Sequence, residues 1–313
     1  MRIARTVSAL RATLTPVRRE GRRIGLVPTM GALHDGHLSL IGRAREQCDV
    51  VVVSLFVNPA QFNERSDLER YPRDERRDAE LAAASGADVL FAPSVEEVYP
   101  PGFATTVEVL GLTERLEGAA RGSEHFRGVA TVVTKLLCMA MPDVAYFGQK
   151  DAQQVLVIRR LARDLNLPVR IESLPTVREP DGLALSSRNA LLAADERARA
   201  LALPAALQAA AALAATGERS AEMLLDAARK AMRPYDVEPE YIALVEPETL
   251  EPLATLSGEA LLAIAARVGE IRLIDNALLA PTATQTVATD AARDALPTLS
   301  QPLQGKATAT CSA

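Results

Sequence analysis

The chain has 313 residues, a formal net charge of −5 at pH 7, and 48% apolar and 24% charged residues. This length allows a full hydrophobic core and predicts two domains. The acidic balance provides no positive field for a phosphate backbone, which excludes a general nucleic-acid binder.

Membrane and metal sites are not indicated either. No uninterrupted apolar run approaches the length needed to cross a bilayer, so no membrane partner is predicted. Cys48, Cys138 and Cys311 are odd in number and lack metal-ligand spacing, which argues against disulfides and against a zinc site. Reduced thiols fit a cytoplasmic protein.

The first 23 residues contain seven arginines and a single acid, Glu20, which superficially resembles a transit peptide. However, Val7, Leu10 and Leu14 follow helical spacing, and the segment leads directly into an apolar run. We therefore predict a surface helix of the mature domain.

The next stretch, residues 24–47, is predicted to form a strand, a glycine-bearing turn and a helix from about residue 37. Backbone N–H groups and aligned peptide dipoles at such a helix start favour an anion. His34 and His37 flank Gly36 there, although the chain has only three histidines. The alternative is a surface turn with two solvated histidines. A random distribution of three histidines would rarely place two of them beside one glycine, which argues against this alternative.

The following elements alternate between strand and helix, which predicts a doubly wound, Rossmann-like parallel sheet over residues 1–176. A continuous β-branched run at 49–57 indicates a strand buried on both faces. Further strands are expected at 87–93, 144–147 and 169–173, with an edge strand at 104–110; helices are expected at 71–85, 129–140 and 151–165.

From Ala190 the composition shifts to alanine-rich helices, predicted at 192–215 and 219–232. Apolar stretches at 241–245 and 261–274 follow, as in a small α+β domain. We place the domain boundary within 177–188 and the second domain, a lid, at 177–282. Residues 283–313 lack apolar periodicity, which predicts a disordered tail.

Three later segments place polar groups where a ligand could bind. Gln61 follows the strand at 49–57, and Lys150 lies in the Gly-Gln-Lys-Asp turn after the strand at 144–147. In open α/β sheets ligands bind at the carboxyl ends of strands. Ser186, Ser187 and Arg188 form a dense set of hydrogen-bond donors. The alternatives are a solvated glutamine, a Lys-Asp pair that caps a helix, and an ordinary Ser-Ser-Arg-Asn helix cap.

The stretch that contains His34 and His37 carries a resemblance to known proteins. The His-x-Gly-His turn resembles the signature of the adenylyl-transferring α/β superfamily that includes class I aminoacyl-tRNA synthetases. The longer string Pro-Thr-Met-Gly-Ala-Leu-His-Asp-Gly-His, at 28–37, resembles the pantothenate synthetases, or pantoate–β-alanine ligases, and the resemblance covers about residues 1–280. It implies an ATP-dependent condensation of (R)-pantoate with β-alanine to pantothenate through a pantoyl adenylate, with release of AMP and pyrophosphate. It also implies Mg²⁺ bound through the ATP phosphates, no dedicated protein metal site, and a homodimer.

The resemblance assigns roles to residues of this chain. His34, His37 and Lys150 would be catalytic, with His37 as proton donor. Gln61 would bind both pantoate and β-alanine, and Gln154 would bind pantoate. The residues that would bind ATP are Met30, Gly31, Ala32, Leu33, His34, Asp35, Gly36, His37, Gly148, Gln149, Lys150, Asp151, Val177, Leu185, Ser186, Ser187 and Arg188.

One segment departs from the family pattern. The loop from Arg121 to Phe126 is one residue longer than usual, so Arg121 and His125 are left out of the predicted site. Two other functions stay open on the residues alone. A nucleotidylyltransferase shares the His-x-Gly-His turn but needs further basic residues for its acceptor phosphate. A nucleotide-binding protein without catalysis would not need intact His34, His37 and Lys150.

Overall fold

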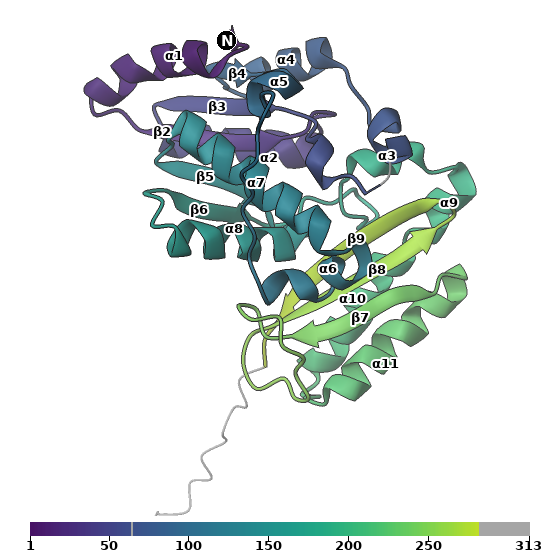
Figure 1. Ribbon diagram of the computed structural model, residues 1–313. Helices are drawn as coiled ribbons and strands as arrows, with labels where there is room; N and C mark the ends of the chain where they lie inside the picture. Colours follow the sequence, from purple (N-terminus) through teal and green to yellow (C-terminus); the bar gives the residue numbers. More distant parts are fainter. Residues whose placement is uncertain (64, 282–313) are drawn as a thin grey trace, which may run out of the picture. The chain divides into compact units, whose positions relative to one another are not determined.

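The computed structural model describes residues 1–63 and 65–281, so the predicted tail at 283–313 lies outside the described residues. A parallel six-stranded sheet forms the larger part of the fold, in the order β1-β4-β3-β2-β5-β6 (Figure 1). Its strands are β1 (Arg2–Ala4), β2 (Ile24–Thr29), β3 (Val50–Leu55), β4 (Val89–Phe91), β5 (Val144–Gly148) and β6 (Arg170–Leu174).

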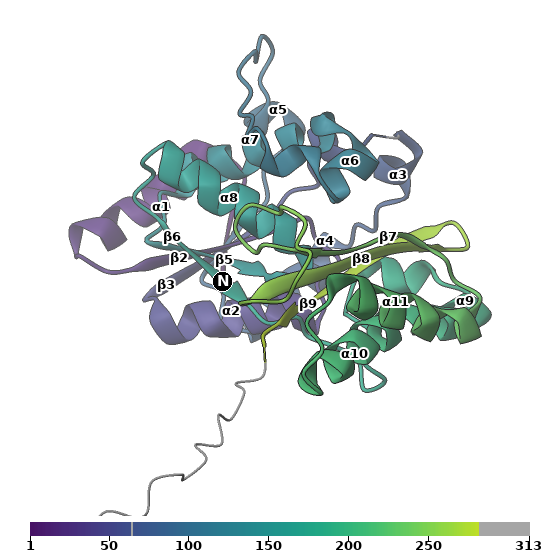
Figure 2. The same ribbon diagram turned by 90° about the horizontal axis from the view of Figure 1, so that it is seen from below.

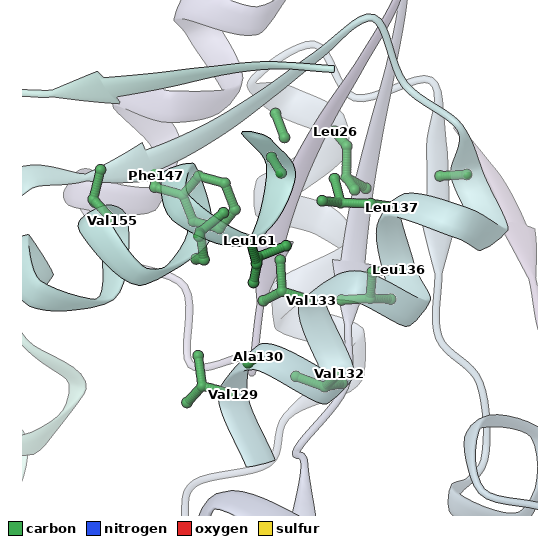
Figure 3. Packing of buried hydrophobic residues seen from close by; sticks show 14 of the residues in the cluster. Leu26, Val129, Ala130, Val132, Val133, Leu136, Leu137, Phe147, Val155 and Leu161 are labelled. Carbon is green, nitrogen blue, oxygen red and sulfur yellow. The ribbon is translucent and has the colours of Figure 1, made fainter. Parts of the chain in front are cut away.

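Helices cover both faces of this sheet, as a doubly wound fold requires. On one face, α1 (Val7–Arg19), α7 (Ser123–Ala140) and α8 (Ala152–Asp164) pack on alternate residues of the strands, such as Leu26 and Phe147. Figure 3 shows this packing: Val133 and Leu137 of α7 point toward Leu26. On the other face lie α2 (Asp35–Gln47) and α4 (Glu75–Ala84). The remaining short helices are η1 (Pro59–Gln61), α3 (Arg65–Arg70), α5 (Val95–Val98), η2 (Leu112–Glu114), α6 (Glu117–Arg121) and η3 (Gln149–Asp151).

The predicted alternation is confirmed, including the edge strand β6, except that the sequence does not predict β1 and that one expected edge strand is absent from the described sheet. The expected edge strand at 104–110 is wrong, because this segment pairs with no strand of the described chain. Its backbone N–H of Val107 instead donates to Oγ1 of Thr131 on α7, at 2.9 Å. The edges of the sheet are β1 and β6. At three residues, β1 is too short to produce an alternating pattern in the sequence.

The smaller C-terminal domain has an antiparallel sheet of β7 (Pro239–Val245), β8 (Ala260–Val268) and β9 (Ile271–Leu279) (Figure 2). The apolar stretch at 261–274, predicted as one segment, is divided between β8 and β9. Gly269, with φ +58°, turns the chain between them, a conformation that glycine adopts at little cost. The predicted helix at 192–215 is also divided. The helical segments of this domain are η4 (Ser187–Leu191), α9 (Ala194–Arg199), α10 (Ala202–Ala215), α11 (Ala221–Met232) and η5 (Arg233–Tyr235).

The three-stranded sheet is apolar on both faces. Leu262 and Ile264 of β8 pack with α10 and α11, whereas Leu261 and Ala263 belong to the core of the larger sheet domain. The stretch Ala194–Ala215 is long and apolar enough to cross a membrane by length and composition alone. Leu203, Ala206 and Ala210 of this stretch are buried in the C-terminal core, as in an ordinary core helix.

The strand order determines where a ligand can bind. β2 lies between β3 and β5. From β2 the chain first adds β3 and β4 on one side, and later adds β5 and β6 on the other side. Such a topological switch point leaves a crevice outside the carboxyl ends of the two central strands. The histidine turn follows β2 and the lysine turn follows β5, so the two predicted phosphate-binding turns are neighbours in space.

Candidate active site

A cavity of about 1180 Å³ opens at the carboxyl ends of β2 and β5. The larger domain contributes the turns after β2, β3 and β5. The C-terminal domain contributes residues of β9, and the segment 175–189 forms a further wall. The cavity is large enough for more than one small substrate.

A buried carboxylate holds the turn between β2 and α2. Asp78 on α4 accepts hydrogen bonds from the backbone N–H groups of Ala32 and Leu33, at 2.9 and 2.8 Å. Gly31, with φ +90°, is in tight contact with Asp78 and Leu55: a Cβ there would lie 2.9 Å from an oxygen of Asp78 and 2.8 Å from a methyl carbon of Leu55. Residues 31–33 therefore pack against Asp78 and Leu55 and do not line the cavity.

His34 and His37 cap the start of α2 through their Nδ1 atoms. Nδ1 of His34 accepts from the backbone N–H of Gly36 at 3.2 Å, and Nδ1 of His37 accepts from the N–H of His34 at 3.4 Å. A neutral imidazole whose Nδ1 accepts a hydrogen bond carries its proton on Nε2. The ring centroids are 4.2 Å apart. The helix cap thus provides two adjacent Nε2–H donors.

The electrostatic surroundings keep both rings neutral. Burial is the largest cause for His37, and neighbouring His34 and Lys150 add to it, which together lower its pKa to about 3. Burial, followed by the positive charge of Lys150, also lowers the pKa of His34. At neutral pH each imidazole can therefore donate a hydrogen bond without carrying a charge.

Lys150 lies in the turn after β5, with its side chain 19% exposed and its Nζ 3.9 Å from an oxygen of Asp151. Because it acts on the pKa values of His34 and His37, its charge faces the same part of the cavity. The side chain of Asn276 on β9 supports the turn. Its Nδ2 group lies 3.0 Å from the carbonyl oxygen of Gln149 and 2.9 Å from that of Lys150.

The segment after β6 forms a tight hairpin. The backbone N–H of Leu185 donates to the carbonyl of Val177 at 3.0 Å, and Arg178 pairs with Ala184. Ser186 then caps η4 by accepting from the N–H of Arg188 at 3.3 Å. The hydroxyls of Ser187 and Tyr71 lie 3.5 Å apart, which brings this segment to the larger domain.

Gln61 stands at the end of η1, where its amide is oriented by neighbours. Its Oε1 accepts from Nδ2 of Asn58 at 3.0 Å, and its Nε2 lies 3.1 Å from the sulfur of Met30. Asn58 is buried and also donates to the carbonyl of Gly128 at 3.2 Å. One hydrogen of the Gln61 NH₂ group thus faces the sulfur of Met30, and the other is left for a ligand.

Arg121 and His125, which sequence analysis left out, both line the cavity. Ring nitrogens of His125 lie 3.3 and 3.4 Å from Nη1 of Arg121, and its Nδ1 lies 2.7 Å from the carbonyl of Gln61. Burial, followed by the charge of Arg121, lowers the pKa of His125 to about 4. The family pattern alone could not place them, because the loop before His125 is longer than usual.

An ion cluster contributes to the lining of the cavity. Arg272 on β9 makes a bidentate pair with Glu117 on α6, at 2.6 and 2.8 Å. The hydroxyl of Tyr241 also donates to Glu117, at 2.9 Å. Burial favours the neutral form of Glu117, but the hydrogen bonds and charge of Arg272 outweigh it and lower the pKa of this carboxyl.

The structure brings most of the predicted site residues to this cavity. Those that line it are Met30, His34, Gly36, His37, Gln61, Gly148, Lys150, Asp151, Gln154, Val177, Leu185, Ser186, Ser187 and Arg188. The others belong to the same two turns but do not line the cavity: Gly31, Ala32, Leu33, Asp35 and Gln149. Sequence analysis missed Asn58, Tyr71 and Asn276. Asn58 stands beside Gln61 in an Asn-Pro-Ala-Gln string and could have been found, whereas Asn276 lies within an apolar strand and gives no signal.

A doubly wound parallel sheet with paired histidine donors and a lysine at its switch point defines a nucleotide-binding α/β enzyme. Within that class, residues 2–278 match the family model described as pantoate-beta-alanine ligase. The chain belongs to this family. Its reaction is therefore the ATP-dependent condensation of pantoate with β-alanine, which decides against the nucleotidylyltransferase and the non-catalytic binder.

Similar proteins agree over nearly the whole described chain. The pantothenate synthetase of Moorella thermoacetica is 52% identical over 280 residues, which cover 89% of this chain and 99% of that protein. The crystal structure of pantothenate synthetase from Thermus thermophilus matches with a TM-score of 0.86 and 49% identity, covering 90% of this chain and all of that one. The Francisella tularensis pantoate-beta-alanine ligase, solved with Beta-gamma ATP and β-alanine, matches with a TM-score of 0.75 and 35% identity, covering 89% and 97%.

Proposed function

We propose that the condensation proceeds in two steps at the cavity between β2 and β5. First, a carboxylate oxygen of pantoate bonds to the α-phosphorus of ATP while the bond to the bridging oxygen of pyrophosphate breaks. Second, the amine of β-alanine attacks the carbonyl of the pantoyl adenylate, loses a proton and displaces AMP. Neither step requires a protein nucleophile, so the protein acts by positioning and by charge stabilisation.

The single observation that carries this proposal is the convergence of His34, His37 and Lys150 from the ends of two adjacent strands. Negative charge grows on the phosphate oxygens as pyrophosphate leaves. Two neutral Nε2–H donors and an ammonium group can follow this charge without first moving. His37, the proton donor by resemblance to the family, would share its Nε2 hydrogen in a hydrogen bond rather than transfer it. Removing one such donor typically lowers the rate by ~10²–10³-fold.

The remaining cavity residues divide between the substrates. The hairpin residues Val177 and Leu185, with Ser186 to Arg188, would contact ATP. The Gln61 amide, which presents its NH₂ group, would orient the hydroxy acid and then β-alanine. Gln154, on the first turn of α8, would bind pantoate. An amide can orient both substrates without adding net charge to a site that must hold three anionic groups.

Mg²⁺ is expected to enter with the nucleotide. Within residues 1–63 and 65–281 there is no cluster of three or more histidine, cysteine or acidic side chains that could hold a metal ion. Asp151, half-exposed beside Lys150, is a carboxylate that lines the cavity. This donor set suits an ion that keeps its water and phosphate ligands, and the ion would neutralise phosphate charge.

Exchange of labelled pyrophosphate into ATP tests the two-step reaction. The exchange should require pantoate and proceed without β-alanine, because the first step is complete before the amine reacts. Omission of pantoate is the matched control and should abolish the signal. Exchange that strictly required β-alanine would exclude a free adenylate intermediate.

Three further predictions rest on the resemblance to the family. The protein is expected to be a cytoplasmic homodimer, which sedimentation of the purified chain and fractionation of cells can test. The segment 177–282 is proposed as a separate lid domain that begins after β6. Comparing small-angle scattering with and without ATP and pantoate would reveal closure as a decrease in the radius of gyration.

A further inference from the structure

Asn276 is a buried polar residue on β9, an edge strand of the C-terminal sheet, and its side chain contacts the larger domain. Its exposed fraction is 6%, and its amide group lies between the carbonyl oxygens of two successive residues, Gln149 and Lys150. An amide nitrogen has two hydrogens, so both carbonyls can be satisfied at once. These bonds cross from β9 to the backbone of the turn that carries Lys150.

The preceding residue, Asp275, makes an equally specific contact in another direction. It is 3% exposed and forms a bidentate pair with Arg178, at 2.6 and 2.9 Å. Arg178 also donates to the carbonyl of Gly182 at 3.0 Å, which closes the hairpin from within. One oxygen of Asp275 further accepts from the backbone N–H of Asn276 at 2.8 Å, so the two side chains are held relative to one another.

We propose that Asp275 and Asn276 are positioning residues, which set the Lys150 turn and the 177–185 hairpin at a fixed distance from each other. This inference rests on the proposed function of those two segments in binding ATP. Adjacent residues in an extended strand point to opposite faces, and here one side chain reaches each segment. Through these two residues, β9 would take part in phosphate binding by fixing the positions of the two segments.

These contacts matter for the rate because charge stabilisation requires accurately positioned groups. The turn at Gln149–Asp151 is a single 3-10 turn without a side-chain cap at its start. Displacing a catalytic group by about 1 Å can reduce a rate by roughly 10²-fold. Without the Asn276 amide, the two carbonyls would lose their partners, and the Lys150 backbone would have no fixed position from the β9 side.

The test is a double-mutant cycle between Asn276 and Lys150. Single-turnover adenylate formation is measured for Asn276→Ala, Lys150→Ala and the double variant, alongside melting temperatures. Asn276→Ala should slow adenylation by about 10- to 100-fold. In the Lys150→Ala background the same substitution should have little further effect, because groups that act through one another are not additive.

Arg272→Gln is the matched control, since it breaks another contact between β9 and the larger domain. Its effect should add to that of Lys150→Ala, because Arg272 contacts Glu117 and not the turn. Additive effects for Asn276 as well would overturn the inference and indicate a general packing role. If Lys150→Ala itself leaves the rate unchanged, the proposed function of Lys150 fails instead. Asn276→Asp should be at least as slow as Asn276→Ala, because a carboxylate would face two carbonyl oxygens.

Discussion

Tyr99 donates its hydroxyl hydrogen to Oδ1 of Asn58 at 2.8 Å. Burial raises the pKa of Tyr99 to about 12, so the phenol keeps this hydrogen at any physiological pH. With its oxygen occupied, Asn58 must direct its NH₂ group toward Oε1 of Gln61. The hydrogen bonds that link Tyr99, Asn58 and Gln61 therefore determine which end of the Gln61 amide faces the cavity.

Tyr99→Phe should consequently raise the KM for pantoate by about 5- to 10-fold, the equivalent of one hydrogen bond. The Asn58 oxygen would then keep only the backbone N–H of Ala60 as a donor, at 3.3 Å, so the amide would hold Gln61 less firmly. Steady-state kinetics with pantoate varied at saturating ATP measures the effect. Tyr146→Phe is the control, because the Tyr146 hydroxyl donates to Gln47 at 2.9 Å, outside the cavity-lining set. Equal changes in KM for the two variants would contradict the proposed orientation.

Lys150→Ala should reduce the rate of single-turnover adenylation by ~10²–10³-fold. It should change the free energy of unfolding by no more than about 0.5 kcal/mol, because the side chain borders a cavity and its loss creates no apolar void. Lys150→Arg should restore little activity, since a planar guanidinium is bulkier and places its charge differently. A near wild-type rate for Lys150→Ala would mean that this lysine only pairs with Asp151.

The adenylation rate should not fall with an apparent pKa near 6.5, the ordinary value for histidine. The pKa of His37 is lowered to about 3, so this imidazole stays a neutral donor well below pH 6, and the pKa of His34 is shifted in the same direction. A pH profile of adenylation between pH 5 and 8, on protein shown to be folded at each pH, measures this. A clear loss centred near pH 6.5 would show that one imidazole must change its charge.

The same lowered pKa values predict that acid destabilises the fold. Between the ordinary histidine value and the folded values of about 3 for His37 and about 4 for His125, the unfolded chain binds more protons than the folded one. The free energy of unfolding should thus decrease as pH falls through this window, by roughly 1.4 kcal/mol per pH unit for each histidine. Urea unfolding at several pH values tests the slope, and His37→Gln should make it smaller.

Gly128→Ala should destabilise the protein by about 3 kcal/mol or more, because overpacking against backbone cannot be relieved by a side-chain rotation. A Cβ at Gly128 would lie 2.2 Å from the carbonyl oxygen of Ala60, where α7 crosses η1 beside Gln61. Gly42→Ala on α2 is the matched control, since a Cβ there meets no atom within 4 Å. It should stabilise the helix by up to about 1 kcal/mol. Similar unfolding midpoints for the two variants would contradict the close approach.

The parts of the fold that the sequence predicts are those with a local cause. The β-branched run of β3 and the helical spacing of Leu10 and Leu14 determine their own elements. The His-x-Gly-His turn contains its own helix cap. By contrast, the contact between Asn276 and the Lys150 turn joins residues 126 positions apart, and its geometry exists only after two sheets have packed. The same holds for Asp78, which lies on a charged helix and shows no sign of its bonds to Ala32 and Leu33.

The central position of β2 has a consequence for the order of events in folding. Gly25 pairs with Val51 in β3 on one side and with Val144 in β5 on the other, so one neighbour is close in sequence and the other is distant. Long-range parallel pairing is slow because a large loop must close first. On a ribosome, the β2–β3 unit with its histidine turn can form while β5 is still unmade. The nascent chain would then hold half of a phosphate site, and the arrival of the lysine turn would complete it.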